Sequence, residues 1–297
     1  INQDGYPDLL FANSQRMYER PPVHVYGDVL KSEQFIALPS NGTYDGVMTD
    51  LFGTGHDDLV IACQHNGTHS DVTAIIYFGS EEGLSENYKL ELPVPNAVSM
   101  AAGDFNGDGK KDLAFVSGGI LRVFYHQRAG FNPAVFQEYP VQMKAIAAAD
   151  LDGDGYADVC FKTPDGRVGV LFGSANGLDI DNISWVGGVQ SDVAAVAGGS
   201  TAGLIASSSE WRPCIVTIGG TQYIYCMEQE KAAFYSCQAV RTIVPGFELE
   251  CPGAVYATAG DLTGNGAEDL ILTVFAHKDQ EAPCRIYLND GSGICPE

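Results

Sequence analysis

Two copies of one acidic turn constrain the fold of this chain more than any other feature. The segment DFNGDGKKDLAF begins at residue 104, and DLDGDGYADVCF begins at residue 150. Each places side-chain oxygens at loop positions 1, 3, 5 and 9, with a glycine at position 6 that allows a sharp turn. A hard cation such as calcium requires this set of donors. Apolar runs follow both loops and predict buried strands, whereas an EF-hand would need flanking helices and a Glu at position 12.

The two loops predict two calcium sites, and two other segments of the chain predict weaker calcium sites. The predicted ligands are Asp104, Asn106, Asp108, the Lys110 carbonyl and Asp112, and then Asp150, Asp152, Asp154, the Tyr156 carbonyl and Asp158. DLTGNGAEDLIL at 261–272 offers Asp261, Thr263, Asn265 and Asp269 with less charge, and the first residues offer Asn2, Asp4 and Asp8 without a leading acid. We expect the ion to stabilise the turn rather than to catalyse a reaction, because the loop itself can fill the coordination shell.

A fourth loop illustrates the alternative to metal binding. DLFGTGHDDLVI at 50–61 has Phe52 and Thr54 where ligands belong, which predicts a purely structural turn. Asp-Gly and Asn-Gly pairs are common in metal-free hairpins, so each loop also has this simpler interpretation.

The spacing of the loops defines a repeat. Their first residues, Asp50, Asp104, Asp150 and Asp261, are 54, 46 and 111 residues apart. The longest gap holds two periods, so one unit is concealed, and we expect its remnant at 193–209. Six units of about fifty residues are typical of propellers or solenoids. Within one unit, strands are predicted at 98–104, 113–116, 121–126 and 136–141, the four strands of a propeller blade.

The predicted fold is therefore all-β, a β-propeller of four-stranded blades in a single domain over residues 1–297. The blades are expected near 1–45, 46–97, 98–143, 144–190, 191–253 and 254–297. The chain starts inside a loop, which predicts a fragment of a longer protein. Six units are recognisable here, and both a six-bladed ring and a seven-bladed ring in the full protein are compatible with them.

The segments YFGSEEGLS (77–85) and LFGSANGLD (171–179), together with the DxNxDGxxDL loops, resemble the FG-GAP or VCBS repeat. This repeat forms the blades of integrin alpha-subunit propellers and of some fungal and bacterial lectins. The resemblance implies a propeller with calcium on one face, usually seven-bladed and usually engaged in extracellular recognition.

The composition of the chain indicates which classes of partner to exclude and which cellular compartment to expect. A net charge of −22 argues against nucleic acid and anionic membranes as partners, and no apolar run is long enough to insert into a bilayer. Eight cysteines predict an oxidising environment. The expected disulfides are Cys226 with Cys237, Cys284 with Cys295, and Cys214 with Cys251, leaving Cys63 and Cys160 as buried thiols. Sequons at Asn41, Asn66 and Asn182 predict glycosylation.

No enzymatic motif stands out. The sequence lacks a GxSxG elbow, an HExxH pair and a Walker loop. We therefore expect no catalysis, although two carboxylates from different blades would suffice for a glycosidase.

Recognition is expected in the loops opposite the calcium face, because rigid scaffolds commonly carry binding residues on loops. The candidate segments are 13–23, 63–72, 207–214 and 275–284. Their candidate ligand-binding residues are Arg16, Tyr18, Arg20, His65, His69, Trp211, Arg212, His277 and Lys278. The alternative for each residue is a solvated loop tip.

The function predicted from the sequence is adhesion or ligand recognition by a secreted or surface-exposed calcium-binding propeller. The four candidate segments differ from one another in sequence, which favours one composite protein-binding face over the repeated pockets of a lectin. A lectin or an accessory domain of a secreted enzyme remains an alternative. Another is a filament or appendage subunit that self-associates through its incomplete first blade.

Overall fold

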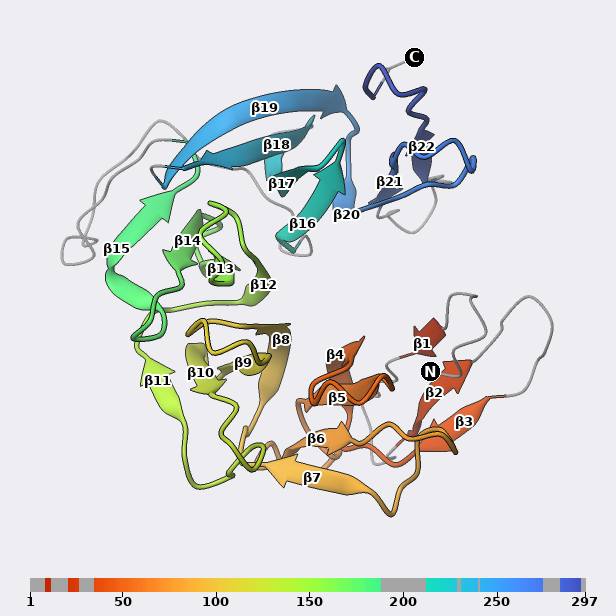
Figure 1. The fold of residues 1–297 in the computed structure, drawn as a ribbon, viewed down its shortest axis with the longest axis vertical. Helices are drawn as coiled ribbons and strands as arrows, with labels where there is room; N and C mark the ends of the chain where they lie inside the picture. Colours follow the sequence, from red (N-terminus) through yellow and green to blue (C-terminus); the bar gives the residue numbers. More distant parts are fainter. Residues whose placement is uncertain are drawn as a thin grey trace. The chain divides into compact units, whose positions relative to one another are not determined.

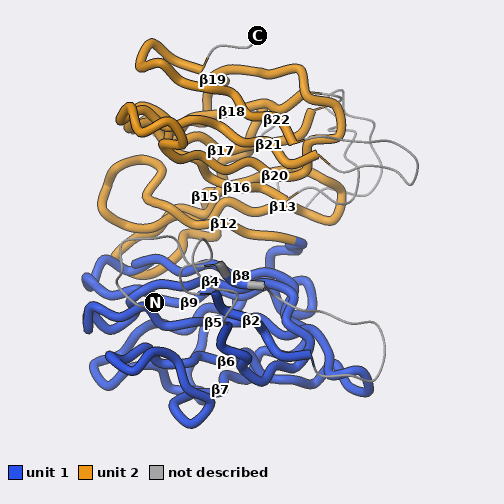
Figure 2. The backbone as a smooth tube through the Cα atoms, turned by 90° about the vertical axis from the view of Figure 1, so that its right-hand side faces the viewer, with its two compact units in different colours: residues 1–144 blue, residues 145–297 orange. Residues whose placement is uncertain are grey.

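The computed structural model of this chain describes residues 9–11, 21–26, 35–187, 212–228, 231–239, 241–274 and 284–294. These residues form strands and turns without any helix (Figure 1). A search of the same ranges for a helix long and apolar enough to cross a membrane accordingly finds none. The chain divides into two compact units, residues 1–144 and 145–297 (Figure 2).

The first unit contains three antiparallel sheets, each formed by strands that are consecutive in the chain. The first sheet has β1 (Leu9–Phe11), β2 (Val23–Tyr26) and β3 (Ile36–Leu38). The second has β4 (Thr43–Thr49), β5 (Asp58–Cys63), β6 (Ala74–Tyr77) and β7 (Lys89–Leu92). The third has β8 (Ala97–Gly103), β9 (Asp112–Ser117), β10 (Ile120–Phe124) and β11 (Gln137–Tyr139).

The second unit repeats this plan. Its first sheet has β12 (Ala145–Ala149), β13 (Asp158–Lys162), β14 (Val168–Phe172) and β15 (Asp179–Trp185). The next has β16 (Cys214–Ile218), β17 (Thr221–Glu228), β18 (Lys231–Gln238) and β19 (Thr242–Glu250), and the last has β20 (Ala254–Gly260), β21 (Asp269–Val274) and β22 (Arg285–Tyr287). The prediction of an all-β chain built from four-stranded blades is confirmed, while the number of blades stays a prediction.

The second strand of a blade is apolar throughout because both of its faces pack against neighbouring sheets. In β5, Leu59 and Ile61 join a core with the first sheet, while Val60 and Ala62 join a core with the third. Because successive side chains of a strand point to opposite faces, a strand between two packed sheets must be apolar at every position. All six residues of β5 are buried, including Asp58 at its start.

The concealed unit is the sheet of β16 to β19, and it differs from the prediction in the turn that joins its first two strands. Its expected remnant at 193–209 lies outside the described residues, and all four strands of its sheet follow that segment. Gly219 and Gly220 join β16 to β17 with φ values of 57° and 75°. Two consecutive residues with positive φ make the short hairpin turn that matches the strand twist, and glycine adopts this conformation without strain. A two-residue turn therefore replaces the nine-residue acidic loop.

The predicted disulfides Cys226–Cys237 and Cys214–Cys251 are wrong, since all four residues are free thiols. Cys226 pairs with Ala233 across β17 and β18, and Ala233 lies four residues from Cys237 along β18 (237 minus 233). Four residues of strand span roughly 13 Å, which is well beyond the reach of a disulfide. Spacing in sequence predicted a hairpin correctly but not the register within it.

The other described cysteines are also free thiols. Cys284 is exposed, and its predicted partner Cys295 lies outside the described residues, so this pairing stays a prediction. Cys63 and Cys160 are buried thiols. Burial raises the pKa of both thiols, so they remain protonated and unreactive near neutral pH.

Candidate functional site

A buried aspartate at position 9 closes each of the four described loops. These residues are Asp58, Asp112, Asp158 and Asp269, none of them more than 2% exposed. One carboxylate oxygen accepts the backbone N–H of loop position 2, and the other accepts an N–H just after the third strand. The donor pairs are Leu51 and Gly79, Phe105 and His126, Leu151 and Gly173, and Leu262 and Asn289, at 2.8–3.0 Å. We call this arrangement the clamp, because it ties three parts of one sheet together.

The clamp explains the FG segments. The donors Gly79 and Gly173 are the glycines of YFGS and LFGS. A Cβ atom on Gly79 would lie 2.3 Å from the carbonyl oxygen of Asp57. Only glycine therefore brings this N–H close enough to reach the Asp58 carboxylate, which gives that glycine of the motif a direct structural role.

The aspartate at position 1 is held by the amides of its own loop. Asp50, Asp104, Asp150 and Asp261 each accept three backbone N–H groups at 2.7–3.2 Å. Glycines at positions 4 and 6 have φ between 68° and 91°, which turns these amides inward. Positions 3 and 5 of the two strong loops also accept a backbone N–H from two residues further on. All four predicted ligand positions of these loops therefore have structural bonds that do not require a metal.

The loop at Asp50 forms the same turn with other residues. Thr54 accepts the N–H of His56 through Oγ1 at 3.3 Å, as Asp108 accepts the N–H of Lys110 at 2.9 Å. A hydroxyl thus replaces the carboxylate at position 5, and Phe52 replaces the ligand at position 3. The loop keeps its shape while losing two of its charged or polar metal donors.

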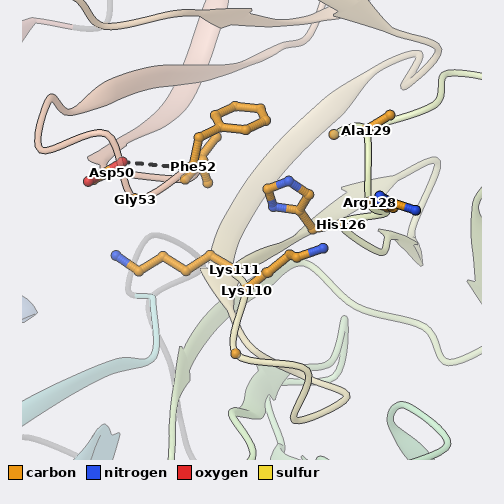
Figure 3. Close-up of a pocket in the computed structure, with 11 residues that line it drawn as sticks. Asp50, Phe52, Gly53, Lys110, Lys111, His126, Arg128 and Ala129 are labelled. Carbon is orange, nitrogen blue, oxygen red and sulfur yellow. Dashed lines mark hydrogen bonds between the residues drawn. The ribbon is translucent and has the colours of Figure 1, made fainter.

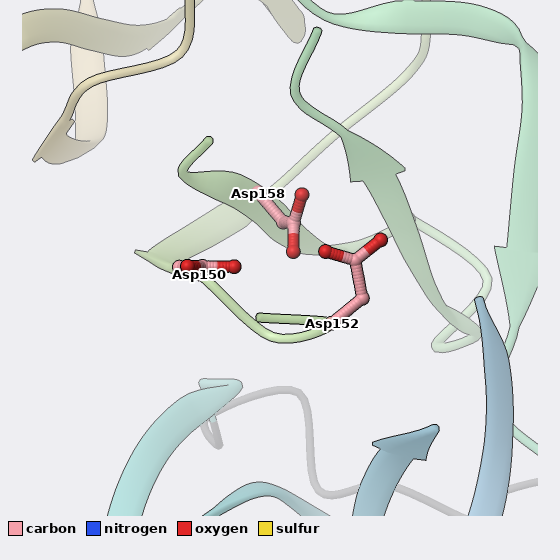
Figure 4. Close-up of side chains that lie close together, drawn as sticks. All are labelled: Asp150, Asp152 and Asp158. Carbon is pink, nitrogen blue, oxygen red and sulfur yellow. The ribbon is translucent and has the colours of Figure 1, made fainter. Parts of the chain in front are cut away.

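The loop at 150–158 presents the best donor set for a cation. The carboxylates of Asp150, Asp152 and Asp158 converge, with ligand oxygens all within 4.8 Å of one another (Figure 4). Burial, together with the charges of Asp152 and Asp154, raises the pKa of Asp158 to about 7 against the opposing effect of the hydrogen bonds from Gly173 and Leu151. A cation among these oxygens would offset that repulsion, so the residues present fit calcium.

The other two predicted sites are less converged. Burial raises the pKa of Asp112 to about 7, with Asp108 and Asp104 adding to the effect. Although all three aspartates are described, they do not form a cluster like that at 150–158, so an ion would have to draw their side chains together. In the loop at 261–269, Asn265 uses its amide to donate to the Asn289 carbonyl at 2.8 Å. The predicted site at Asn2, Asp4 and Asp8 lies outside the described residues.

A cavity of about 510 Å³ lies between the loops that start at Asp50 and Asp104, and its wall is basic. Lys110, Lys111 and Arg128 line it together with His126 and Phe52 (Figure 3). The sequence analysis missed this site because its residues come from three separate segments. The signal available was a Lys-Lys pair inside an acidic loop.

His126 is the most constrained residue of this cavity. Its ring lies 4.8 Å from the rings of both Phe52 and Phe131, and the residue is only 6% exposed. Its Nδ1 atom has no hydrogen-bond partner in the described structure. Burial and the charge of Lys110 lower the pKa of His126. The Lys110 ammonium donates to the Gln127 carbonyl and the Lys111 ammonium to the Thr49 hydroxyl. The cavity thus combines exposed cationic side chains with a buried neutral imidazole.

A second cavity, of about 600 Å³, lies beside the loop at 261–269. Its basic side chain is Arg285, whose Nη1 donates to the carbonyl of Glu250 at 2.7 Å. Because its wall carries a single basic side chain together with Asp290, this cavity is the weaker candidate for an anion.

The predicted recognition residues are only partly described. His65 and His69 lie in one turn of the first unit, where the Asn66 N–H donates to the His69 carbonyl at 3.0 Å. Arg212 lies in the second unit and donates its backbone N–H to Val255. The residues Arg16, Tyr18, Arg20, Trp211, His277 and Lys278 lie outside the described residues.

The three sequons differ in accessibility. Asn182 is exposed on β15. Asn66 is half-buried and accepts the N–H and hydroxyl of Thr68, while Asn41 precedes the fully buried Thr43. Asn182 is therefore the most accessible of the three to a modifying enzyme.

Comparison with known proteins identifies the class. Residues 104–161, which contain both strong loops, match the FG-GAP-like repeat. Together with the blade arrangement of the sheets, this match over part of the chain supports an FG-GAP repeat β-propeller.

Solved structures also match the chain, and one example covers almost all of it. It is the crystal structure of BBS1N in complex with ARL6DN, soaked with mercury, with a TM-score of 0.52 and 14% identity. The match covers 91% of this chain and 71% of that chain, and it shows similarity of fold alone. No curated protein sequence matches.

Proposed function

We propose that this protein is a calcium-stabilised recognition domain that binds an anionic group of an extracellular protein or glycan without catalysing a reaction. The observation that carries the proposal is the basic cavity in a chain of net charge −22. Lys110, Lys111 and Arg128 would attract a carboxylate or sulfate, because a concave cluster of cations raises the local concentration of anions.

Calcium would act as a structural ion in this proposal. The loops at 104–112 and 150–158 join β8 to β9 and β12 to β13, so an ion there would fix the hairpin formed by the first two strands of a blade. The convergence of Asp150, Asp152 and Asp158 supports this role. Lys110 and Lys111 belong to the loop at 104–112, so calcium in that loop would also position two cations of the cavity.

Binding without catalysis is the better proposal for the cavity itself. Its lining contains no Ser, Thr or Cys side chain to serve as a nucleophile. Asp50, its carboxylate, accepts three backbone N–H groups of its own loop. An acid held by amides in this way is stabilised as an anion and is a poor general base.

The extracellular location is proposed from the FG-GAP class and from the sequon at Asn182, which is exposed. The cysteines no longer support it, since those described are free thiols. Burial of most of them would nevertheless protect them from oxidation outside the cell.

The test is binding of two defined anionic probes, a polyglutamate peptide and a sulfated chondroitin oligosaccharide, measured by calorimetry in calcium. We expect the Lys110→Ala/Arg128→Ala double variant to weaken binding of the preferred probe by about tenfold, with less effect at high salt because exposed charges are screened. The preferred probe distinguishes a protein ligand from a glycan ligand.

The control is Lys89→Ala, which removes an exposed cation on β7 that is paired with Glu91 and lies outside the cavity. It should bind like the unaltered protein. Equal weakening by Lys89→Ala would mean that general charge, not the cavity, attracts the probe. Binding of neither probe by the unaltered protein would overturn the proposal.

A further inference from the structure

Arg241 inserts its guanidinium among the ligands of the loop at 150–158. Its Nε donates to Asp152 Oδ2 and its Nη2 to Asp154 Oδ2, both at 2.9 Å. The same Nη2 lies 3.2 Å from the carbonyl oxygen of Gly173, and the guanidinium carbon lies 4.8 Å from the centre of the Phe172 ring. The Asp152 side chain is only 3% exposed. A cation from another sheet thus neutralises the acids at loop positions 3 and 5.

The backbone of Arg241 supports a specific role for this side chain. Three residues join β18 to β19, and Arg241 is the last of them, with φ at 60°. Glycine or asparagine normally occupies the left-handed position of such a hairpin. The hydroxyl of Ser184 on β15 donates to the Arg241 carbonyl at 2.7 Å. Arg241 therefore connects two neighbouring sheets through both its backbone and its side chain, at a position where a side chain is unfavourable.

We propose that Arg241 is a built-in competitor for calcium at the loop at 150–158, and that calcium binding there releases the turn between β18 and β19. The inference rests on the proposed role of calcium in these loops. Asp152 and Asp154 carry the charges that would attract the ion, and the guanidinium already satisfies them. Calcium is repelled by a guanidinium beside it, so calcium and the Arg241 side chain cannot occupy the loop together. When calcium binds, it replaces the guanidinium as the cation that neutralises these acids.

The loop at 104–112 provides an internal comparison. In the described part of the chain, no Lys or Arg forms an ion pair with Asp104 or Asp108. The two loops differ otherwise at position 3, where Asn106 stands in place of Asp152, and in the weaker convergence of the carboxylates at 104–112. If exclusion by the guanidinium outweighs these differences, calcium binds more tightly at 104–112, and the fourth and fifth sheets respond to calcium at concentrations that leave the first unit already saturated.

Terbium luminescence reports on the loop at 150–158 through the part of the signal that Tyr156→Phe removes, because Tyr156 lies within that loop and can transfer excitation to a lanthanide there. We expect Arg241→Gln to tighten terbium binding at this loop by about tenfold and calcium to displace the terbium at correspondingly lower concentration. Arg241→Gly should tighten terbium binding in the same way. Because glycine adopts a positive φ without strain, this second variant keeps the test valid even if Arg241→Gln misfolds. Tyr156→Phe should remove the part of the signal that comes from this loop and leave the part from the loop at 104–112. Arg167→Gln removes an arginine paired with Asp165 in the same unit and should change nothing.

Hydrogen exchange then tests the coupling. Calcium should increase exchange in the turn between β18 and β19 of the unaltered protein, whereas in Arg241→Gln that exchange should be high with or without calcium. Unchanged or weaker terbium affinity in both Arg241 variants overturns the competition, even if calcium binds at 104–112. Absence of calcium binding at both loops overturns the competition together with the proposed role of calcium.

Discussion

Replacing Asp58 with alanine is expected to lower the free energy of unfolding of the first unit by about 4 kcal/mol, with chelator present throughout. The carboxylate is buried and accepts the N–H groups of Leu51 and Gly79. Alanine would leave both amides without an acceptor, and each buried unsatisfied donor costs about 1–3 kcal/mol. Urea unfolding monitored by fluorescence would measure the change.

The neighbouring Asp57 is the matched control, because it is an exposed acid in the same loop. Asp57→Ala should change the free energy of unfolding by less than about 0.5 kcal/mol. The loop at Asp50 lacks metal ligands at positions 3 and 5, so any loss seen there measures the clamp without calcium. A cost for Asp58→Ala no larger than that for Asp57→Ala would show that the clamp is unimportant for stability.

The repeated residues were enough to predict the local fold. Aspartates at positions 1 and 9, glycines between them and the apolar run that follows all act within one hairpin. Their spacing therefore determines the turn and the strand after it, as β8 and β9 illustrate. The sequence did not indicate that Asp112 would bond the N–H of His126 as well as that of Phe105, because that contact depends on where the third strand ends.

Features that depend on pairing between distant segments were missed or predicted wrongly. Arg241 is 89 residues from Asp152, and nothing in its local sequence indicates an acidic partner. The cavity near His126 likewise forms only when two loops of neighbouring sheets come together. The expected pairing of Cys226 with Cys237 failed because a hairpin prediction does not fix which residues face each other.

Removing calcium is expected to lower the melting temperature of each unit by about 5–10 °C. A ligand at 100 times its dissociation constant stabilises the folded state by about 2.7 kcal/mol. For a unit of this size, 1 kcal/mol corresponds to roughly 2–4 °C. The first unit carries one strong loop, at 104–112, and the second carries the loop at 150–158. Calorimetric scans with calcium and with chelator would measure both transitions.

Asp108→Asn assigns the effect to one loop. The asparagine keeps an oxygen that can accept the N–H of Lys110, as Asp108 Oδ1 does, and it removes only the charge. The calcium-dependent rise in melting temperature should then fall sharply in the first unit and persist in the second. A matching Asp57→Asn control, in the loop without metal ligands, should leave both rises intact. If chelator changes neither transition in the unaltered protein, the acidic loops are turns held by their own backbone bonds, and their charge must be explained without calcium.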